Sequence, residues 1–131
     1  MTENDVKGSG ELERLVSELR SLSGDIESCA VISKDGKLLY SSHPDGVDRE
    51  RARAMLSALV GLSERKARED GKAHAAQVRV KTEAGHFLLT RLENGGAIAS
   101  TTGPDARVGL VLYDMRNARA GIEQTIIGEG S

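Results

Sequence analysis

The chain has 131 residues, which suits one domain with a single hydrophobic core. Lysine and arginine number 18 against 20 aspartate and glutamate, so the formal net charge of -2 excludes a basic footprint for nucleic acid. No segment approaches the ~20 apolar residues that a membrane-spanning helix needs, and the polar N-terminus lacks the features of a signal peptide. The single cysteine, Cys29, cannot form an internal disulfide, and together these features favour the cytoplasm.

The first half of the chain predicts a helix followed by a hairpin. Residues 1–10 are polar and contain glycine, and we interpret them as a disordered tail. Apolar residues at offsets of three and four then predict a helix over residues 11–22. Residues 26–33 form an apolar, partly β-branched run, which predicts a strand covered on both faces. The Asp35-Gly36 pair is a strong hairpin signal because glycine supplies the positive φ of the turn, so a second strand begins at Leu38.

A long middle helix is predicted from Asp48 to about Asp70. Its apolar residues cover an arc of roughly 240°, well beyond the ~100° or slightly wider stripe of a simple surface helix. One stripe consists of Ala52, Leu56, Leu59 and Val60, and the stripe beside it consists of Ala54, Met55, Ala58 and Leu62. A single sheet covers only the first stripe. Small alanines tolerate exposure, but Met55 and Leu62 make the second stripe a predicted contact with another chain.

Three further strands and a last helix are predicted after Gly71. Strict alternation over Ala76–Thr82 predicts a one-sided strand, and its Arg79 and Lys81 suit a sheet edge. Residues 86–92 and 97–101 continue an antiparallel meander because the connections are short. Apolar spacing from Val108 to Ile126 predicts the last helix, with residues 128–131 as a frayed end. The predicted fold class is therefore α+β, in the order α-β-β-α-β-β-β-α, with a five-stranded antiparallel sheet and helices on both faces.

We find no catalytic, cofactor-binding or metal-binding motif in the sequence. The Gly-Lys pairs lack the upstream glycine and the following Ser or Thr of a phosphate-binding loop. His43, His74 and His86 are scattered singly, which disfavours a metal site. Cys29 is a possible nucleophile, but it lies in the most apolar stretch of the chain, where a thiol is usually an inert part of the core. We therefore predict a protein that is not an enzyme.

The order of elements and several segments resemble the Roadblock family of dynein light chains and bacterial GTPase regulators. The segments are "LERLVSEL", "ESCAVISKDGKLLYSS" and "GAIASTTGPDARVGLVLYDMRNA", together with the long middle helix. The resemblance spans Glu11 to Ile127 and defines an expected domain over residues 11–127. Family members form dimers through the edge strand of the meander and the middle helix, which joins two sheets into one.

Carried onto this sequence, the resemblance implies a homodimer interface on the strand Ala76–Thr82 and on the helix Ala52–Leu62. The expected interface residues are Ala54, Met55, Ala58, Leu62, Ala76, Val78 and Val80, with Arg51 as a partner contact. Arg51 starts the middle helix with Arg49 and Arg53, and a solvated helix face is the alternative for these arginines. The usual function of the family implies a non-enzymatic, homodimeric regulator or scaffold that binds a small Ras-like GTPase in a bacterial signalling or polarity system and needs no cofactor.

Two other functions compete with this one. A small-molecule sensor would hold its ligand between sheet and helices, but such a pocket normally has aromatic lining and only 2% of the residues are aromatic. A hydrolase or transferase would depend on the Cys29 thiol.

Overall fold

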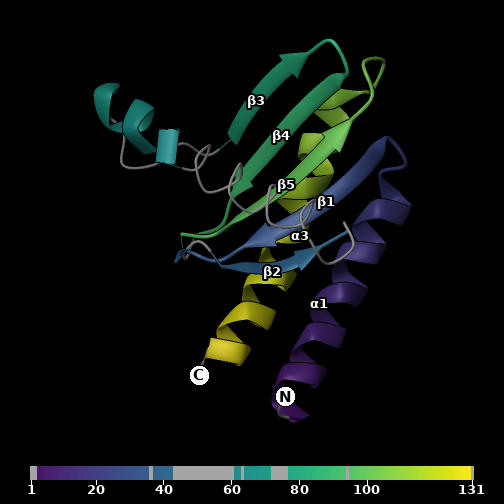
Figure 1. The fold of residues 1–131 in the computed structure, drawn as a ribbon, viewed down its shortest axis with the longest axis vertical. Coiled ribbons are helices and arrows are strands. Elements are labelled where there is room, and N and C mark those ends of the chain that lie inside the picture. Colours follow the sequence, from purple (N-terminus) through teal and green to yellow (C-terminus); the bar gives the residue numbers. More distant parts are fainter. Residues whose placement is uncertain are drawn as a thin grey trace.

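The computed structural model describes residues 3–35, 37–42, 61–62, 64–71, 77–93 and 95–130 (Figure 1). The helices are α1 (Glu3–Leu22) and α3 (Val108–Gly130). The strands are β1 (Ile26–Ile32), β2 (Leu38–Ser41), β3 (Gln77–Thr82), β4 (Gly85–Arg91) and β5 (Ala97–Thr102). Residues 61–62 and 64–69 are also helical, and we call them the middle helical stretch. Within these ranges, no helix is long and apolar enough to cross a membrane.

The described strands form one antiparallel sheet in the order β2-β1-β5-β4-β3. β1 and β2 make the predicted hairpin, and β3, β4 and β5 make the predicted meander, which joins the hairpin through the pairing of β5 with β1. The predicted α+β fold with a five-stranded antiparallel sheet is therefore confirmed. Among these strands β3 lies at one edge, as its alternation and its charges predicted.

An apolar cluster lies on each face of the sheet. α1 and α3 lie side by side and antiparallel across one face of the sheet, so the N-terminus of α1 and the C-terminus of α3 lie at the same end of the molecule (Figure 1). The helix-face cluster beneath them consists of Leu12, Val16, Leu19, Ile26, Cys29, Val31, Leu88, Leu92, Ile98, Val108, Val111, Met115 and Ile122. The opposite-face cluster consists of Ala30, Ile32, Leu89, Ala97 and Ala99. β1 contributes to both clusters in alternation, so the prediction of a strand covered on both faces is confirmed.

The two helices bury their predicted apolar stripes but extend beyond them. α1 begins at Glu3 instead of Glu11, and α3 continues to Gly130. The expected boundaries of the tail, residues 1–10, and of the frayed end, residues 128–131, therefore fall inside helices. Apolar spacing marks only the part of a helix that packs, whereas polar residues also form the backbone hydrogen bonds that lengthen it.

Two turns of the sheet are described in whole or in part. Thr82 pairs with Gly85, so the β3–β4 turn consists of Glu83 and Ala84. Gly36, on which the predicted turn depends, lies outside the described residues, whereas the flanking Ser33 amide donates to the Lys37 carbonyl at 2.8 Å. The Lys37 amide also donates to Ser33 Oγ at 3.1 Å.

The start of α3 is held by Asp25, which precedes β1. Asp25 Oδ2 accepts hydrogen bonds from the Arg107 backbone amide at 3.0 Å and from Arg107 Nε at 3.2 Å. The Arg107 carbonyl accepts from the Val111 amide at 3.0 Å, so the Asp25 carboxylate sits at the helix N-terminus, where negative charge is favoured. The backbone hydrogen bond, followed by the side-chain hydrogen bond, holds the pKa of Asp25 below its usual value.

We expect this carboxylate to make the stability of the fold depend on acid pH. Because the folded pKa of Asp25 lies below the unfolded value of ~3.9, its contribution is complete above the unfolded pKa and is lost as pH falls through the folded pKa. Asp25→Asn should therefore lower the melting temperature at neutral pH and flatten its acid decline. Circular dichroism melts of both proteins check this, with the exposed Asp105→Asn as control. Parallel acid declines of wild type and D25N would contradict it.

Candidate protein-binding surfaces

The edge strand β3 presents apolar side chains on the face opposite α1 and α3. Val78 lies across from Leu89, a member of the opposite-face cluster, and Val80 lies across from Phe87. Val78 is half-buried against that cluster, whereas Val80 is 37% exposed. Alternation places the exposed Arg79 and Lys81 on the other face of the strand. β3 therefore combines an edge position among the described strands with an accessible apolar row.

The middle helical stretch lies against the same face of the sheet. Arg91 of β4 forms an ion pair with Glu64, and the two side chains are 8% and 20% exposed. Arg91 shares its face of β4 with Leu89, two residues earlier, so the ion pair attaches the stretch to the face opposite α1 and α3. Ala67 of the stretch is buried as well. Helices therefore contact both faces of the sheet, as predicted.

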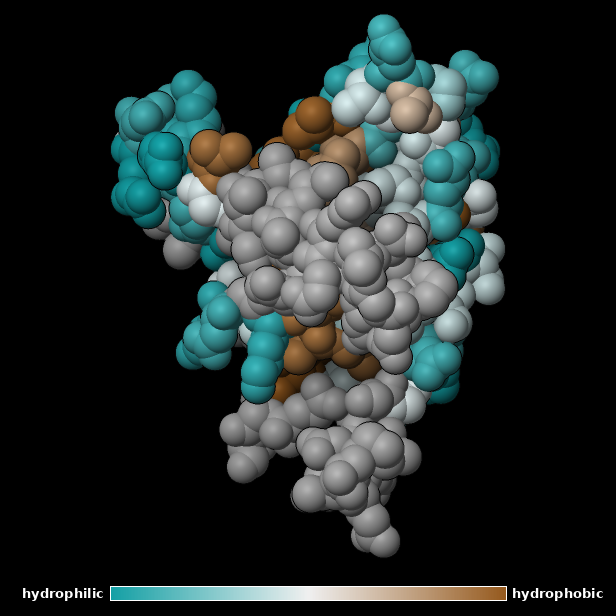
Figure 2. Space-filling view, viewed as in Figure 1, coloured by the Kyte–Doolittle hydropathy of each residue, from teal (hydrophilic) through white to brown (hydrophobic). Residues whose placement is uncertain are grey.

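Apolar surface is open between these two elements. Leu62 in the middle helical stretch is 54% exposed. A hollow separates this stretch from the β3–β4 end of the sheet, and apolar surface lines both of its walls (Figure 2). Exposed apolar side chains on neighbouring elements are typical of a surface that another protein covers.

Three of the predicted interface residues lie in the described part of the chain, namely Leu62, Val78 and Val80, and all three have accessible surface. The others, Ala54, Met55, Ala58, Ala76 and Arg51, lie outside the described residues. Sequence reasoning missed Phe87 beside Val80 and the Arg91–Glu64 pair. The alternation of β4 contained the signal for Phe87, but the ion pair depends on a contact between elements that spacing does not reveal.

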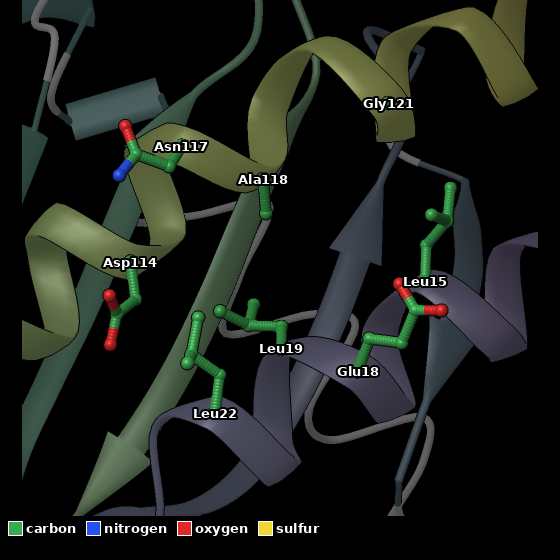
Figure 3. A pocket seen from close by; sticks show the side chains of 8 residues that line it. All are labelled: Leu15, Glu18, Leu19, Leu22, Asp114, Asn117, Ala118 and Gly121. Atoms are coloured by element: carbon green, nitrogen blue, oxygen red, sulfur yellow. The ribbon is translucent and has the colours of Figure 1, made fainter.

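A second candidate surface is a groove between α1 and α3, which is open to solvent on the outer side of the helices (Figure 3). It encloses about 280 Å³ and is lined by Leu15, Glu18, Leu19, Leu22, Asp114, Asn117, Ala118 and Gly121. Asp114 is only 8% exposed. No hydrogen bond or ion pair joins its carboxylate to another residue of the described ranges. The sequence did not predict this groove, because its walls come from two helices and apolar spacing describes only one helix at a time.

The cysteine thiol belongs to the core. Cys29 is buried, and desolvation raises the pKa of its thiol to about 11, so the thiol stays protonated at neutral pH. The Ser100 hydroxyl donates a weak hydrogen bond to Sγ at 3.8 Å. Over the described ranges, no three His, Cys, Asp or Glu side chains gather in a way that would hold a metal ion. His86 is buried in β4, whereas His43 and His74 lie outside those ranges.

Known proteins share both the sequence pattern and the fold. The model of the Roadblock/LC7 domain family matches residues 11–102. The uncharacterized protein MJ0310 of Methanocaldococcus jannaschii is 34% identical over 109 residues, which cover 83% of this chain and 92% of that protein. The structure of the gliding protein MglB from Thermus thermophilus matches with a TM-score of 0.76 at 11% identity, covering 90% of each chain. An MglB structure with a tetrameric arrangement matches with a TM-score of 0.81 at 11% identity, covering 93% of this chain and 92% of that one.

Proposed function

The chain belongs to the Roadblock/LC7 domain family, and from that premise we propose that it is a non-enzymatic homodimer that regulates or scaffolds a small Ras-like GTPase in the cytoplasm. The observation that carries this proposal is the open apolar surface on β3 and the middle helical stretch, where Val80 and Leu62 are exposed. The similarity to MglB, which has been solved in a tetrameric arrangement, supports self-association of this fold.

The proposed dimer pairs β3 of one protomer with β3 of its partner. The outer edge of β3 has no described strand beside it, so its backbone groups can form a ladder that joins the two sheets. A two-fold axis would bring the same apolar row of both copies together, including Val78 and Val80. A stable interface buries ~800 Å² on each partner. β3 and Leu62 would bury part of this area, and the predicted interface residues Ala54, Met55 and Ala58 would bury the rest.

The dimer is proposed to recognise its GTPase through complementary surfaces rather than through bond-making chemistry. The buried Cys29 thiol, which is protonated at neutral pH, offers no nucleophile for an enzymatic alternative. Arg51 is assigned to the contact with an acidic surface of the GTPase, and no cofactor, nucleic acid or membrane insertion enters the proposal.

Val80→Glu is expected to convert the dimer into a monomer. A carboxylate at this position would lose its water inside an apolar interface and would find no cation there. Size-exclusion chromatography with light scattering at tens of micromolar protein measures the mass. The matched control is Gln77→Glu, which adds the same charge to the same strand but on its other face. A monomeric wild type, or a V80E variant that stays dimeric, would contradict the proposed interface.

The GTPase step has its own test. Small Ras-like GTPases loaded with GDP or a GTP analogue are mixed with wild type and with V80E, and binding and GTP hydrolysis are measured. We expect a nucleotide-dependent complex with wild type that V80E weakens. A dimeric wild type that binds none of these GTPases would overturn the regulatory role and leave the dimer intact.

A further inference from the structure

We propose that the groove between α1 and α3 docks an amphipathic helix of a partner protein, and that a Lys or Arg of this helix pairs with Asp114. The groove lies on the helix-covered side of the sheet, whereas the proposed dimer surface lies on the opposite side (Figure 1). This inference therefore stands independently of the proposed dimer.

The walls of the groove are shaped for an apolar side chain. Leu15 and Leu22 of α1 face Ala118 and Gly121 of α3 (Figure 3). An added Cβ at Gly121 would lie 3.7 Å from a Leu15 methyl, which is ordinary van der Waals contact, so α1 and α3 lie close together at this point of the groove. Leu22 remains 72% exposed. An apolar ridge at an open groove is the arrangement that the apolar face of a docked helix covers.

Asp114 supplies the charge preference. Its side chain lies along the groove, its residue is only 8% exposed, and no described residue offers its carboxylate a hydrogen bond or a cation (Figure 3). Neither carboxylate oxygen of Asp114 belongs to the fully buried, unpartnered side-chain atoms of the described residues, so the carboxylate can be reached by a cation that a ligand brings into the groove. Among the other lining residues only Glu18 is ionisable, and Arg14 already pairs with it at 2.6 Å, so the charge preference of the groove rests on Asp114. The groove is therefore complementary to a basic partner.

The occupant is a helix rather than a small molecule. None of the eight lining residues is aromatic, and the groove is open along its length, whereas small-ligand sites are usually enclosed with aromatic lining. Leu15 and Leu22 are seven residues apart on α1, which corresponds to ~10 Å or two helical turns. Leu110 precedes Asp114 by one helical turn and is 45% exposed, so it extends the apolar surface past the charge. A partner helix with leucine-like residues at spacings of three and four, next to a Lys or Arg, fits this pattern.

A pair of designed peptides tests the docking site. The probe is a hydrocarbon-stapled, fluorescein-labelled peptide of about 15 residues, with leucines on one face and lysines beside them. The second peptide has glutamate in place of each lysine. Fluorescence anisotropy should show that the lysine peptide binds wild type and that Asp114→Asn weakens the complex at least about 10-fold. Leu22→Glu should abolish binding, whereas Glu13→Gln, half a helical turn away around α1, should leave it unchanged.

Stability and oligomeric state complete the test. Because D114N removes an unpartnered carboxylate, its melting temperature should equal or exceed that of wild type. V80E should bind the lysine peptide as wild type does, even if the dimer is lost. Equal binding of the glutamate peptide, or unchanged binding by D114N, would overturn the proposal. A lower mass of L22E without peptide would also overturn it, since a second copy of the chain would then occupy the groove.

Discussion

Replacing Arg91 by methionine is expected to lower the free energy of unfolding by about 2–3 kcal/mol, because it removes a charged hydrogen-bonded pair from a largely buried position. Arg91 and Glu64 are 8% and 20% exposed, so water screens the pair poorly. Methionine keeps an unbranched, apolar side chain in the space that the arginine stem occupies. Urea unfolding followed by circular dichroism measures the loss.

Two variants separate the charge effect from other causes. Lys66→Met removes a cation from the same helical stretch, but the Lys66 side chain is 71% exposed and lies 3.7 Å from Asp70, so its expected cost is below about 1 kcal/mol. The double variant Arg91→Met with Glu64→Leu should recover most of the loss, since an apolar pair replaces the ion pair without leaving a charge. If R91M lost no more stability than K66M, the buried ion pair would not be what holds this stretch.

The ion pair also links stability to the proposed function. It attaches the middle helical stretch to β4, and that stretch carries the exposed Leu62. When the attachment fails, Leu62 no longer has a fixed position relative to Val80. We therefore expect R91M to weaken the dimer as well as the fold, although Arg91 is itself buried and does not belong to the exposed apolar surface.

Hydrophobic periodicity in the sequence was sufficient to predict the helices, the strands and the fold class. It was not sufficient to predict the contacts and the groove that form between separate elements. The alternation of β3 and the unbroken apolar run of β1 predicted an edge strand and a doubly covered strand, because burial on one or two faces selects those patterns. Asp114 shows the limit of this reasoning. Its position in the sequence places Asp114 beside the apolar stripe of α3. That Asp114 is only 8% exposed and lies in a groove with residues of α1 becomes apparent only when the helices are placed in space. The pairing of Arg91 with Glu64 likewise requires two elements to be placed in space.

Gly85 at the start of β4 allows β4 to lie close to the end of β5. Gly85 has a φ of +149°, which side chains of L-residues rarely adopt. A Cβ at this position would lie 1.8 Å from the carbonyl oxygen of Thr102, a backbone atom of β5 that cannot move aside without disturbing the sheet. Glycine is therefore required both by the backbone conformation and by the close approach of the neighbouring strand.

Gly85→Ala is accordingly expected to lower the free energy of unfolding by about 3 kcal/mol or more, as backbone strain and overpacking add. The control is Gly24→Ala, where an added Cβ meets nothing within 4 Å and the expected change is below about 0.5 kcal/mol. Urea unfolding measures both values, and amide hydrogen exchange locates the effect in β3 and β4. Because Gly85 pairs with Thr82 of β3, a disturbance at this end of β4 should also weaken the proposed dimer. Equal stability of the two variants would mean that the fold does not require glycine at the close approach of β4 to β5.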